Sequence, residues 1–413
     1  MDLRAQTATH DDLLARRLDR LIPMLMERAD LDAWVLSARE YNEDPVLATM
    51  LPAEWLKTAR RRTILVFLRD GDSVARRAVA RYPVGEAFPS SWDPESEPDQ
   101  WKCLATLLDE ADPARIGINT LTTFALADGL SATERDAMLA ALPERLRDRV
   151  VSAEAAAIGW LETRLPEEMH ALAEGCAIAH DFLHRALSPE VIIPGTTTTR
   201  DVEWWLRQVV HDAGYGSWFH PSCSVQRRGG THREGFAGKP ADTVITHGDL
   251  VHIDFGIVRT GLCTDQQQHA YALHPGETGP PAGLVAGLAA ANRLQDLLMA
   301  QFATGRIGNE VLAATRAAAQ ADGIDGLIYT HPIGVHGHAA GATIGLWDRQ
   351  EAIPGDGNYP LFPNTAWSIE LQARVRVEEW SDQVVQFMLE EDAWFDGDRC
   401  RFLDGRQTAL WVV

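Results

Sequence analysis

The chain has 413 residues, of which 46% are hydrophobic and 23% are charged, and its formal net charge is −21. This length and composition predict a globular protein with enough apolar residues to build two domains. The acidic balance argues against nucleic-acid binding, which rewards basic surfaces. No run approaches 18 apolar residues, and the first residues lack a signal-peptide pattern, so we expect no membrane association.

The five cysteines are scattered and show neither the paired spacing of a metal site nor that of a disulfide framework. Reduced thiols fit this distribution, and we therefore expect a cytoplasmic protein. The fingerprints of P-loop and dinucleotide binding and the serine-hydrolase elbow are absent from the sequence. The informative pattern lies instead in the carboxylates and histidines of the second half.

Residues 1–151 are predicted to form a separate α/β unit. The run 9–26 has helical periodicity with an acidic first turn. The polar, proline-containing stretch 90–99 predicts a surface loop. We expect this unit to be a scaffold without chemistry of its own. Short apolar runs that are typical of strands occur at 32–36, 62–68 and 115–120.

Residues 152–413 are predicted to begin with helices and to continue in hairpins. The proline and acidic residues at 166–168 favour the first turn of a helix. His180 and His184 follow at the i, i+4 spacing that can bind zinc, but Asp181 stands where that motif requires glutamate. We therefore expect the two histidines to lie on a plain helix face.

The first hairpin is predicted around the alternating segment 251–258, which is rich in β-branched and aromatic residues. If the chain turns about the midpoint that follows Arg259, Asp254 lies directly opposite Asp265. Opposed carboxylates destabilise a sheet, and a bound cation removes that penalty. A turn centred one residue later would shift the register and break this pairing.

A second pair of alternating strands is predicted on either side of a polar turn at 378–381. A turn about Trp380 places Glu370 opposite Glu390. A turn shifted by half a residue places Glu370 opposite Glu391 instead. Spacing alone leaves the choice between the two neighbouring acids open.

These acids and His331 follow one another in the order Asp, Asp, His, Glu, Glu. Oxygen-rich sites with a single imidazole suit hard or borderline divalent metal ions, often in pairs. A lone acid in a strand is usually a solvated edge residue. Two hairpins that oppose acids, with the glycine-rich segment from His331 to His338 between them, instead predict a metal site.

The segments 248–256 and 331–338, with Asp265 between them, resemble the pita-bread metallohydrolases, the superfamily of methionine aminopeptidase, aminopeptidase P, prolidase and creatinase. The segment 152–169 resembles the opening of the catalytic domain in the creatinase and prolidase branch. The resemblance implies an α+β fold with two domains. These are a smaller creatinase-like, non-catalytic α/β domain over 1–151 and a pita-bread catalytic domain over 152–413.

The resemblance also implies roles for individual residues. Asp265 and Glu390 would bridge two divalent ions, of which manganese is the first expectation and cobalt, zinc and iron are alternatives. Glu370 would shuttle a proton from a bridging hydroxide to the leaving nitrogen. His338, or alternatively His232, would form a hydrogen bond to the scissile carbonyl of the substrate and stabilise its oxyanion. The implied metal ligands are Asp254, Asp265, His331, Glu370 and Glu390.

The implied activity is that of a dinuclear metallopeptidase, similar to Xaa-Pro aminopeptidase or prolidase, that acts on the N-terminal bond of Xaa-Pro peptides. We expect a small peptide or small-molecule substrate and a homodimer. Three departures surround the expected pocket: Leu371 and Gln372 replace Pro-Gly, Met388 replaces an arginine, and the run 266–269 replaces Thr-Arg-Thr. They leave open a metal-dependent hydrolase or lyase for a non-peptide molecule. An inactive binding protein on this scaffold is a further alternative, against which the full ligand set argues.

Overall fold

The computed structural model describes residues 3–230 and 242–413, which divide into two compact units, Met1–Leu161 (unit 1) and Glu162–Val413 (unit 2). The expected domain boundary after residue 151 lies just before helix α6 (Glu154–Glu162), whereas the two compact units divide after Leu161, near the end of this helix. The division of roles between a non-catalytic and a catalytic domain stays a prediction. Among the helices of the described residues, none is long and apolar enough to cross a membrane.

Unit 1 is an α/β unit built on one five-stranded sheet with the order β3-β2-β1-β4-β5. Before α6, its elements are α1 (Leu3–Arg28), β1 (Ala33–Arg39), α2 (Pro45–Ala48), η1 (Ala53–Trp55), β2 (Arg62–Asp70), β3 (Ser73–Val79), α3 (Gln100–Ala111), β4 (Ile116–Ile118), η2 (Ala125–Ala127), α4 (Ala132–Ala141), α5 (Glu144–Arg147) and β5 (Val150–Ser152). The predicted helix and three predicted strands are therefore confirmed.

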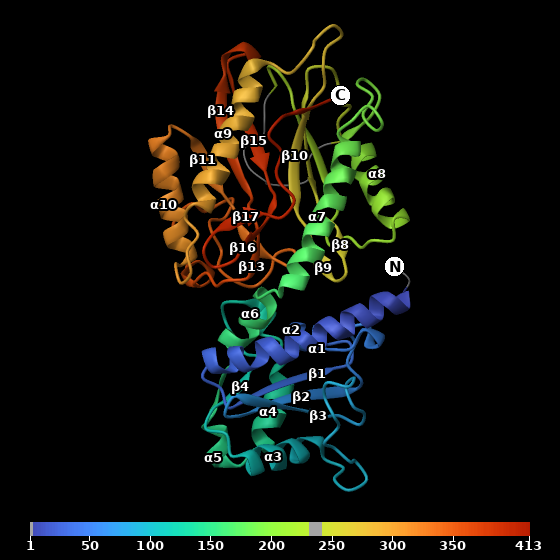
Figure 1. The fold of residues 1–413 in the computed structure, drawn as a ribbon, viewed down its shortest axis with the longest axis vertical. Helices are drawn as coiled ribbons and strands as arrows, with labels where there is room; N and C mark the ends of the chain where they lie inside the picture. Colours follow the sequence, from blue (N-terminus) through green and yellow to red (C-terminus); the bar gives the residue numbers. More distant parts are fainter. Residues whose placement is uncertain (1–2, 231–241) are drawn as a thin grey trace. The chain divides into compact units, whose positions relative to one another are not determined.

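The sheet of unit 1 is apolar on both faces because helices cover it. Leu104 of α3 and Met138 of α4 pack with Val35 and Val66 on one face. Trp34 and Phe67 stack on the other face, with ring centroids 5.5 Å apart. Figure 1 shows α1 on one side of the sheet and α3 and α5 on the other. The strands β1, β2 and β4 are largely buried on both faces, which explains why their sequences are continuous apolar runs.

Unit 2 begins with helices and continues in hairpins, as predicted. Its elements after α6 are α7 (Pro166–Ala186), α8 (Thr199–Asp212), β6 (Ser222–Gln226), β7 (Leu250–Phe255), β8 (Val258–Arg259), β9 (Leu262–Cys263), β10 (Gln266–Tyr271), α9 (Ala282–Met299), α10 (Gly308–Ala321), β11 (Asp325–Ile328), β12 (His331–Ile333), η3 (Asp356–Asn358), β13 (Thr365–Ser368), β14 (Leu371–Val377), η4 (Glu378–Trp380), β15 (Gln383–Leu389), β16 (Asp392–Phe395), β17 (Cys400–Phe402) and β18 (Trp411–Val412).

Unit 2 contains two helix-covered sheets, together with a four-stranded sheet β12-β13-β16-β17 and a two-stranded sheet β8-β9. Helices α7 and α8 cover the sheet β18-β10-β7-β6, where Phe182 and Leu206 pack with Phe255. Helices α9 and α10 cover the sheet β11-β14-β15. Gly287 lets α9 approach closely, because a Cβ there would lie 2.0 Å from the ring of Phe387. Figure 1 shows the strands between the two helix pairs, so residues that face inward from both sheets can meet.

Candidate metal centre

The first hairpin pairs β7 with β10 two residues out of the predicted register. Its turn residues are Thr260 and Gly261, which have φ values of 50° and 78° and so make a tight two-residue turn. Asp254 consequently lies opposite Gln267, and the predicted direct pairing with Asp265 is wrong. Because side chains alternate with a period of two, this shift still leaves Asp254, Asp265 and Gln267 on one face.

The second hairpin has the register that a turn about Trp380 predicts. The ladder between β14 and β15 runs up to the pair of Leu371 and Leu389. The ladder between β13 and β16 continues in the same register beyond it. Glu370 and Glu390 therefore occupy opposed positions between the two ladders.

Glu391, the alternative ligand, belongs to a different hydrogen-bonded group. Its carboxylate accepts from His180 Nε2 at 2.6 Å and from Gln268 Nε2 at 3.0 Å. The other ring nitrogen of His180 lies 2.8 Å from Asp404. Burial opposes the protonation of this histidine, but Glu391 and Asp404 outweigh burial and raise the pKa of His180 to about 9. The helix-face role expected for His180 is thus an ion pair that ties α7 to the end of the second hairpin.

His180→Gln is expected to destabilise the protein in a pH-dependent way. The ordinary pKa is 6.5 and the folded pKa about 9, so the ion pair contributes fully below pH 6.5 and is lost as pH rises through about 9. We expect a difference in unfolding free energy of up to roughly 3 kcal/mol in mildly acidic buffer. Urea unfolding of both proteins across this range measures it, and a pH-independent difference contradicts the assignment.

His331 opens β12, and its Nε2 atom faces three carboxylates. Its Nδ1 lies 3.0 Å from the carbonyl oxygen of Pro332, which only accepts, so Nδ1 carries a proton, and in the neutral ring Nε2 presents a lone pair. Among the described residues Nε2 has no hydrogen-bond partner. A lone pair that faces acceptors, on a ring fixed through its other nitrogen, is the arrangement of a metal ligand. The carboxylate oxygens nearest to Nε2 belong to Glu390 at 3.6 Å, Glu370 at 3.8 Å and Asp265 at 4.0 Å.

The carboxylates around His331 are enclosed in the protein. Asp265, Glu370 and Glu390 are only 3%, 5% and 1% exposed. Burial, followed by the charge of Glu390, raises the pKa of Asp254, Asp265 and Glu370 well above the ordinary range. One oxygen each of Asp254 and Asp265 has no hydrogen-bond partner within the described ranges. Grouped buried carboxylates are unfavourable unless protons or cations neutralise them, so this donor set fits divalent metal ions.

The structure brings the predicted ligands together to different degrees. Asp265, His331 and Glu390 each offer a ligand atom within 4.8 Å of the others. Glu370 adjoins this group beside His331. Asp254 faces it from β7, where its carboxyl group interacts with that of Glu390.

Gln267 was not predicted as a site residue, yet it lies at the centre of the group. Its amide nitrogen donates to Glu370 at 2.8 Å and to Glu390 at 2.6 Å. Its oxygen accepts from His252 Nε2 at 3.0 Å, and burial lowers the pKa of His252 to about 4. The neutral histidine thus orients an amide that aligns two carboxylates. The glutamine run 266–268 in a buried strand was the available signal.

His338 lies beside the carboxylates and is open to solvent. Its ring centroid is 4.7 Å from that of His331, 5.4 Å from Trp218 and 6.1 Å from Tyr329. Partial burial of its ring, followed by the nearby His331, lowers the pKa of His338 to about 4. It is therefore neutral at neutral pH and can donate one N–H. Trp218 and Tyr329 carry no motif that would have predicted them. His232, the remaining predicted residue, lies outside the described residues.

The sequence matches a known family over most of unit 2. The model of metallopeptidase family M24 matches residues 167–394. The chain belongs to metallopeptidase family M24. The expected superfamily and the expected enzyme class, a metallopeptidase, are thereby confirmed. No curated protein sequence matches the chain closely enough to count as a relative.

Solved structures share the fold over nearly the whole chain. An X-Pro aminopeptidase from Thermotoga maritima superposes with a TM-score of 0.64 at 16% identity, covering 94% of this chain and 100% of its own. A Xaa-Pro dipeptidase from Bacillus anthracis gives 0.62 at 16%, covering 97% and 99%. A dipeptidase from Pyrococcus horikoshii gives 0.64 at 17%, covering 96% and 100%. At these identities the likeness shows the fold alone, and it confirms the α+β pita-bread fold of this M24 chain.

Proposed function

We propose that this M24 protein is a dinuclear metal-dependent peptidase that hydrolyses the N-terminal bond of Xaa-Pro peptides. The observation that carries the proposal is the buried Nε2 atom of His331, which has no hydrogen-bond partner among the described residues and lies 3.6–4.0 Å from the carboxylates of Asp265, Glu370 and Glu390. Family membership supports peptide hydrolysis. The likeness in fold to proteins described as X-Pro aminopeptidase and Xaa-Pro dipeptidase supports the substrate class.

The proposed ligand set contains four carboxylates and one imidazole. We assign Asp265 and Glu390 as the ligands shared by two ions. A position of Glu390 between the other three carboxylates supports this assignment, because its charge raises the pKa of each of them. Oxygen-rich ligands with one imidazole favour manganese first, with cobalt, zinc and iron as alternatives. The full set is Asp254, Asp265, His331, Glu370 and Glu390.

We assign the residues of the site separate roles in hydrolysis. When bound by these residues, divalent ions would supply Lewis acidity and would lower the pKa of water from 15.7 to about 7. Glu370, whose pKa is raised by burial and by Glu390, takes up the proton of the attacking water and delivers it to the leaving nitrogen. Gln267 donates to one oxygen of Glu370 and so fixes the orientation of this carboxylate for the transfer. The neutral N–H of His338 donates to the scissile carbonyl as it becomes an oxyanion.

His338→Ala is expected to lower kcat by about 10²–10³-fold, the usual effect of removing one oxyanion donor. Metal content is expected to stay that of the wild type, because His338 is not among the proposed ligands. Steady-state kinetics and elemental analysis of the same preparations measure both quantities. His170→Ala, at an exposed histidine on α7, is the control. Parallel loss of metal and activity in His338→Ala contradicts the assigned role.

A panel of Gly-Pro, Ala-Pro, Leu-Pro and longer Xaa-Pro peptides tests the substrate class. The metal-free protein is loaded with manganese, cobalt, zinc or iron in turn, and release of the first residue is followed. Leu-Ala serves as the matched control for Leu-Pro. We expect Xaa-Pro substrates to be preferred. If protein with two bound ions per chain hydrolyses none of these peptides with any of the metals, the peptidase proposal is ruled out.

A second candidate is a metal-dependent hydrolase or lyase for a small non-peptide molecule. Gln372 lies two residues after Glu370 on β14 and is buried. Its side-chain oxygen has no hydrogen-bond partner among the described residues. Met388 lies directly opposite on β15. An unsatisfied buried acceptor beside the site favours a substrate with its own donor there. Metal-loaded protein that is inert on the peptide panel favours this candidate.

A further inference from the structure

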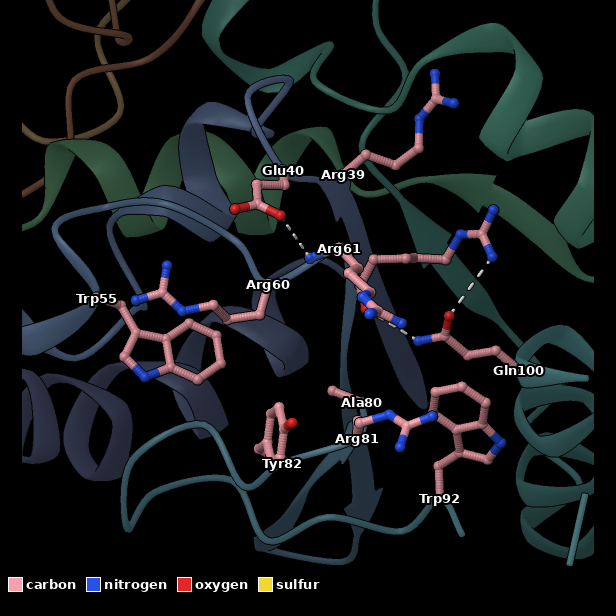
Figure 2. Close-up of a pocket in the computed structure, with 11 residues that line it drawn as sticks. Arg39, Glu40, Trp55, Arg60, Arg61, Ala80, Arg81, Tyr82, Trp92 and Gln100 are labelled. Atoms are coloured by element: carbon pink, nitrogen blue, oxygen red, sulfur yellow. Dashed lines mark hydrogen bonds between the residues drawn. The ribbon is translucent and has the colours of Figure 1, made fainter. Parts of the chain in front are cut away.

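Unit 1 carries a basic and aromatic pocket of about 540 Å³ (Figure 2). Five arginines, three aromatic residues and a single acid, Glu40, are among the side chains that line it. This concentration of positive charge stands out in a chain of net charge −21. The volume lies within the range of about 300–1,000 Å³ that is usual for small-ligand sites. The pocket is therefore a candidate binding site in a unit that was expected to be a plain scaffold.

Two of the arginines are fixed where strands begin and end. Arg39, the last residue of β1, pairs directly with Arg62, the first residue of β2. Like charges in this arrangement destabilise a sheet. The buried Glu134 of α4 relieves the repulsion, since it accepts from Arg62 Nε at 2.6 Å and Nη2 at 3.0 Å and lies 3.6 Å from Arg39. One carboxylate thus serves two guanidinium groups, and net positive charge remains.

The other three arginines have no carboxylate within ion-pair distance in the part of the chain that the structure describes. They are Arg60, Arg61 and Arg81, and all three are exposed. Arg61 has a φ of 54°, which is uncommon for a residue with a side chain. Glu40 holds this backbone, since its carboxylate accepts from Arg61 N at 3.4 Å, as Figure 2 shows. Unpaired guanidinium groups on a fixed backbone are available to an anion.

Aromatic faces complete the pocket. The guanidinium of Arg60 lies 5.2 Å from the ring centre of Trp55. The indole N–H of Trp92 donates a hydrogen bond to the carbonyl oxygen of Glu97 at 2.7 Å, which fixes the orientation of the ring. Tyr82 is 58% exposed. These rings offer surface on which a planar group can stack.

We propose that this pocket binds a phosphate monoester that carries a planar ring, the chemical class of nucleoside monophosphates and aryl phosphates. Guanidinium groups bind phosphate oxygens through paired N–H donors. A dianionic phosphate matches several unpaired arginines better than a carboxylate does. The planar ring of the ligand stacks on the aromatic side chains of the pocket, which are Trp55, Tyr82 and Trp92. Repulsion from the remaining acidic surface is screened beyond about 8 Å at physiological salt.

Isothermal titration of the full-length protein tests the proposal with defined probes. The probes are AMP, phenyl phosphate, inorganic phosphate, adenosine and benzoate. We expect AMP or phenyl phosphate to bind at one site, and phosphate, adenosine and benzoate each to bind at least about tenfold more weakly. Whichever of AMP and phenyl phosphate binds more tightly shows whether the natural ligand belongs to the nucleoside monophosphates or to the aryl phosphates. Absence of saturable binding by both esters, or binding no tighter than inorganic phosphate, overturns the proposal.

Substitutions locate the site. Arg61→Asn/Arg81→Gln removes two unpaired charges, and asparagine tolerates the positive φ at position 61. We expect the double variant to bind the ester at least about tenfold more weakly. Arg135→Gln, at an exposed arginine of α4 outside the pocket, is the matched control and should bind as the wild type does. If the double variant fails to fold, Arg81→Gln alone provides the test. Unchanged affinity in a folded variant overturns the proposal.

Discussion

Asp254→Asn/Asp265→Asn is expected to abolish metal binding and peptide hydrolysis together. The substitution removes two of the five proposed ligands, including one that both ions share, while it keeps side-chain size. Because metal ions lower the pKa of water from 15.7 to about 7, we expect kcat/KM to fall by more than about 10⁴-fold. Elemental analysis and peptide kinetics measure the two losses. Asp398→Asn, at a carboxylate whose side chain is 86% exposed, is the control.

The same variant is expected to be more stable than metal-free wild type at neutral pH, by roughly 1–3 kcal/mol. Burial and Glu390 raise the pKa of Asp254 and Asp265 in the folded state. The folded wild type therefore binds more protons than the unfolded chain above pH 3.8, and its stability falls as pH rises. The advantage of the variant should vanish at low pH and grow with increasing pH. Urea unfolding in chelator measures it. Equal metal content in wild type and variant contradicts the site.

Glu390→Gln is expected to abolish activity and weaken metal binding, whereas Glu391→Gln should leave most of both. Glu390 lies against His331 and accepts from Ser368 and Gln267, while Glu391 is held by His180. We expect a loss in kcat/KM of more than about 10³-fold for Glu390→Gln, since a shared metal ligand is removed.

The two glutamate variants are controls for each other, because both replace a buried carboxylate by an amide at neighbouring positions. Glu391→Gln should instead lower stability, since the protonated His180 loses an ion-pair partner. Kinetics, metal content and unfolding are measured on both variants. Activity retained in Glu390→Gln and lost in Glu391→Gln contradicts the assignment.

Period-two alternation explains why the face of the site could be predicted while its register could not. The register depended on whether Thr260 takes a positive φ, which is uncommon for a β-branched residue. A two-residue shift keeps a side chain on its face, so Asp254 still points toward the carboxylates. A one-residue shift reverses the face, which is why the position of Glu390 or Glu391 depended on the turn at Trp380.

Roles that depend on tertiary approach could not be predicted from local patterns. Gln267 reaches Glu370 and Glu390 only because β10 runs beside the end of β15, where Gln267 N donates to the carbonyl oxygen of Glu390 at 3.0 Å. The basic pocket of unit 1 gathers residues such as Arg61 and Arg81 from separate strand ends. By contrast, the apolar runs of β1, β2 and β4 were predictable because buried strands need continuous apolar residues.

The most direct test of the central claim is a metal titration of chelator-stripped protein with Leu-Pro hydrolysis followed in parallel. The claim is that the carboxylates around His331 hold two divalent ions on which hydrolysis depends. We predict that activity rises with bound metal, saturates at about two ions per chain and is absent from Asp254→Asn/Asp265→Asn at every metal concentration. Full activity in the stripped protein, or metal-dependent activity that persists in this variant, would contradict the claim.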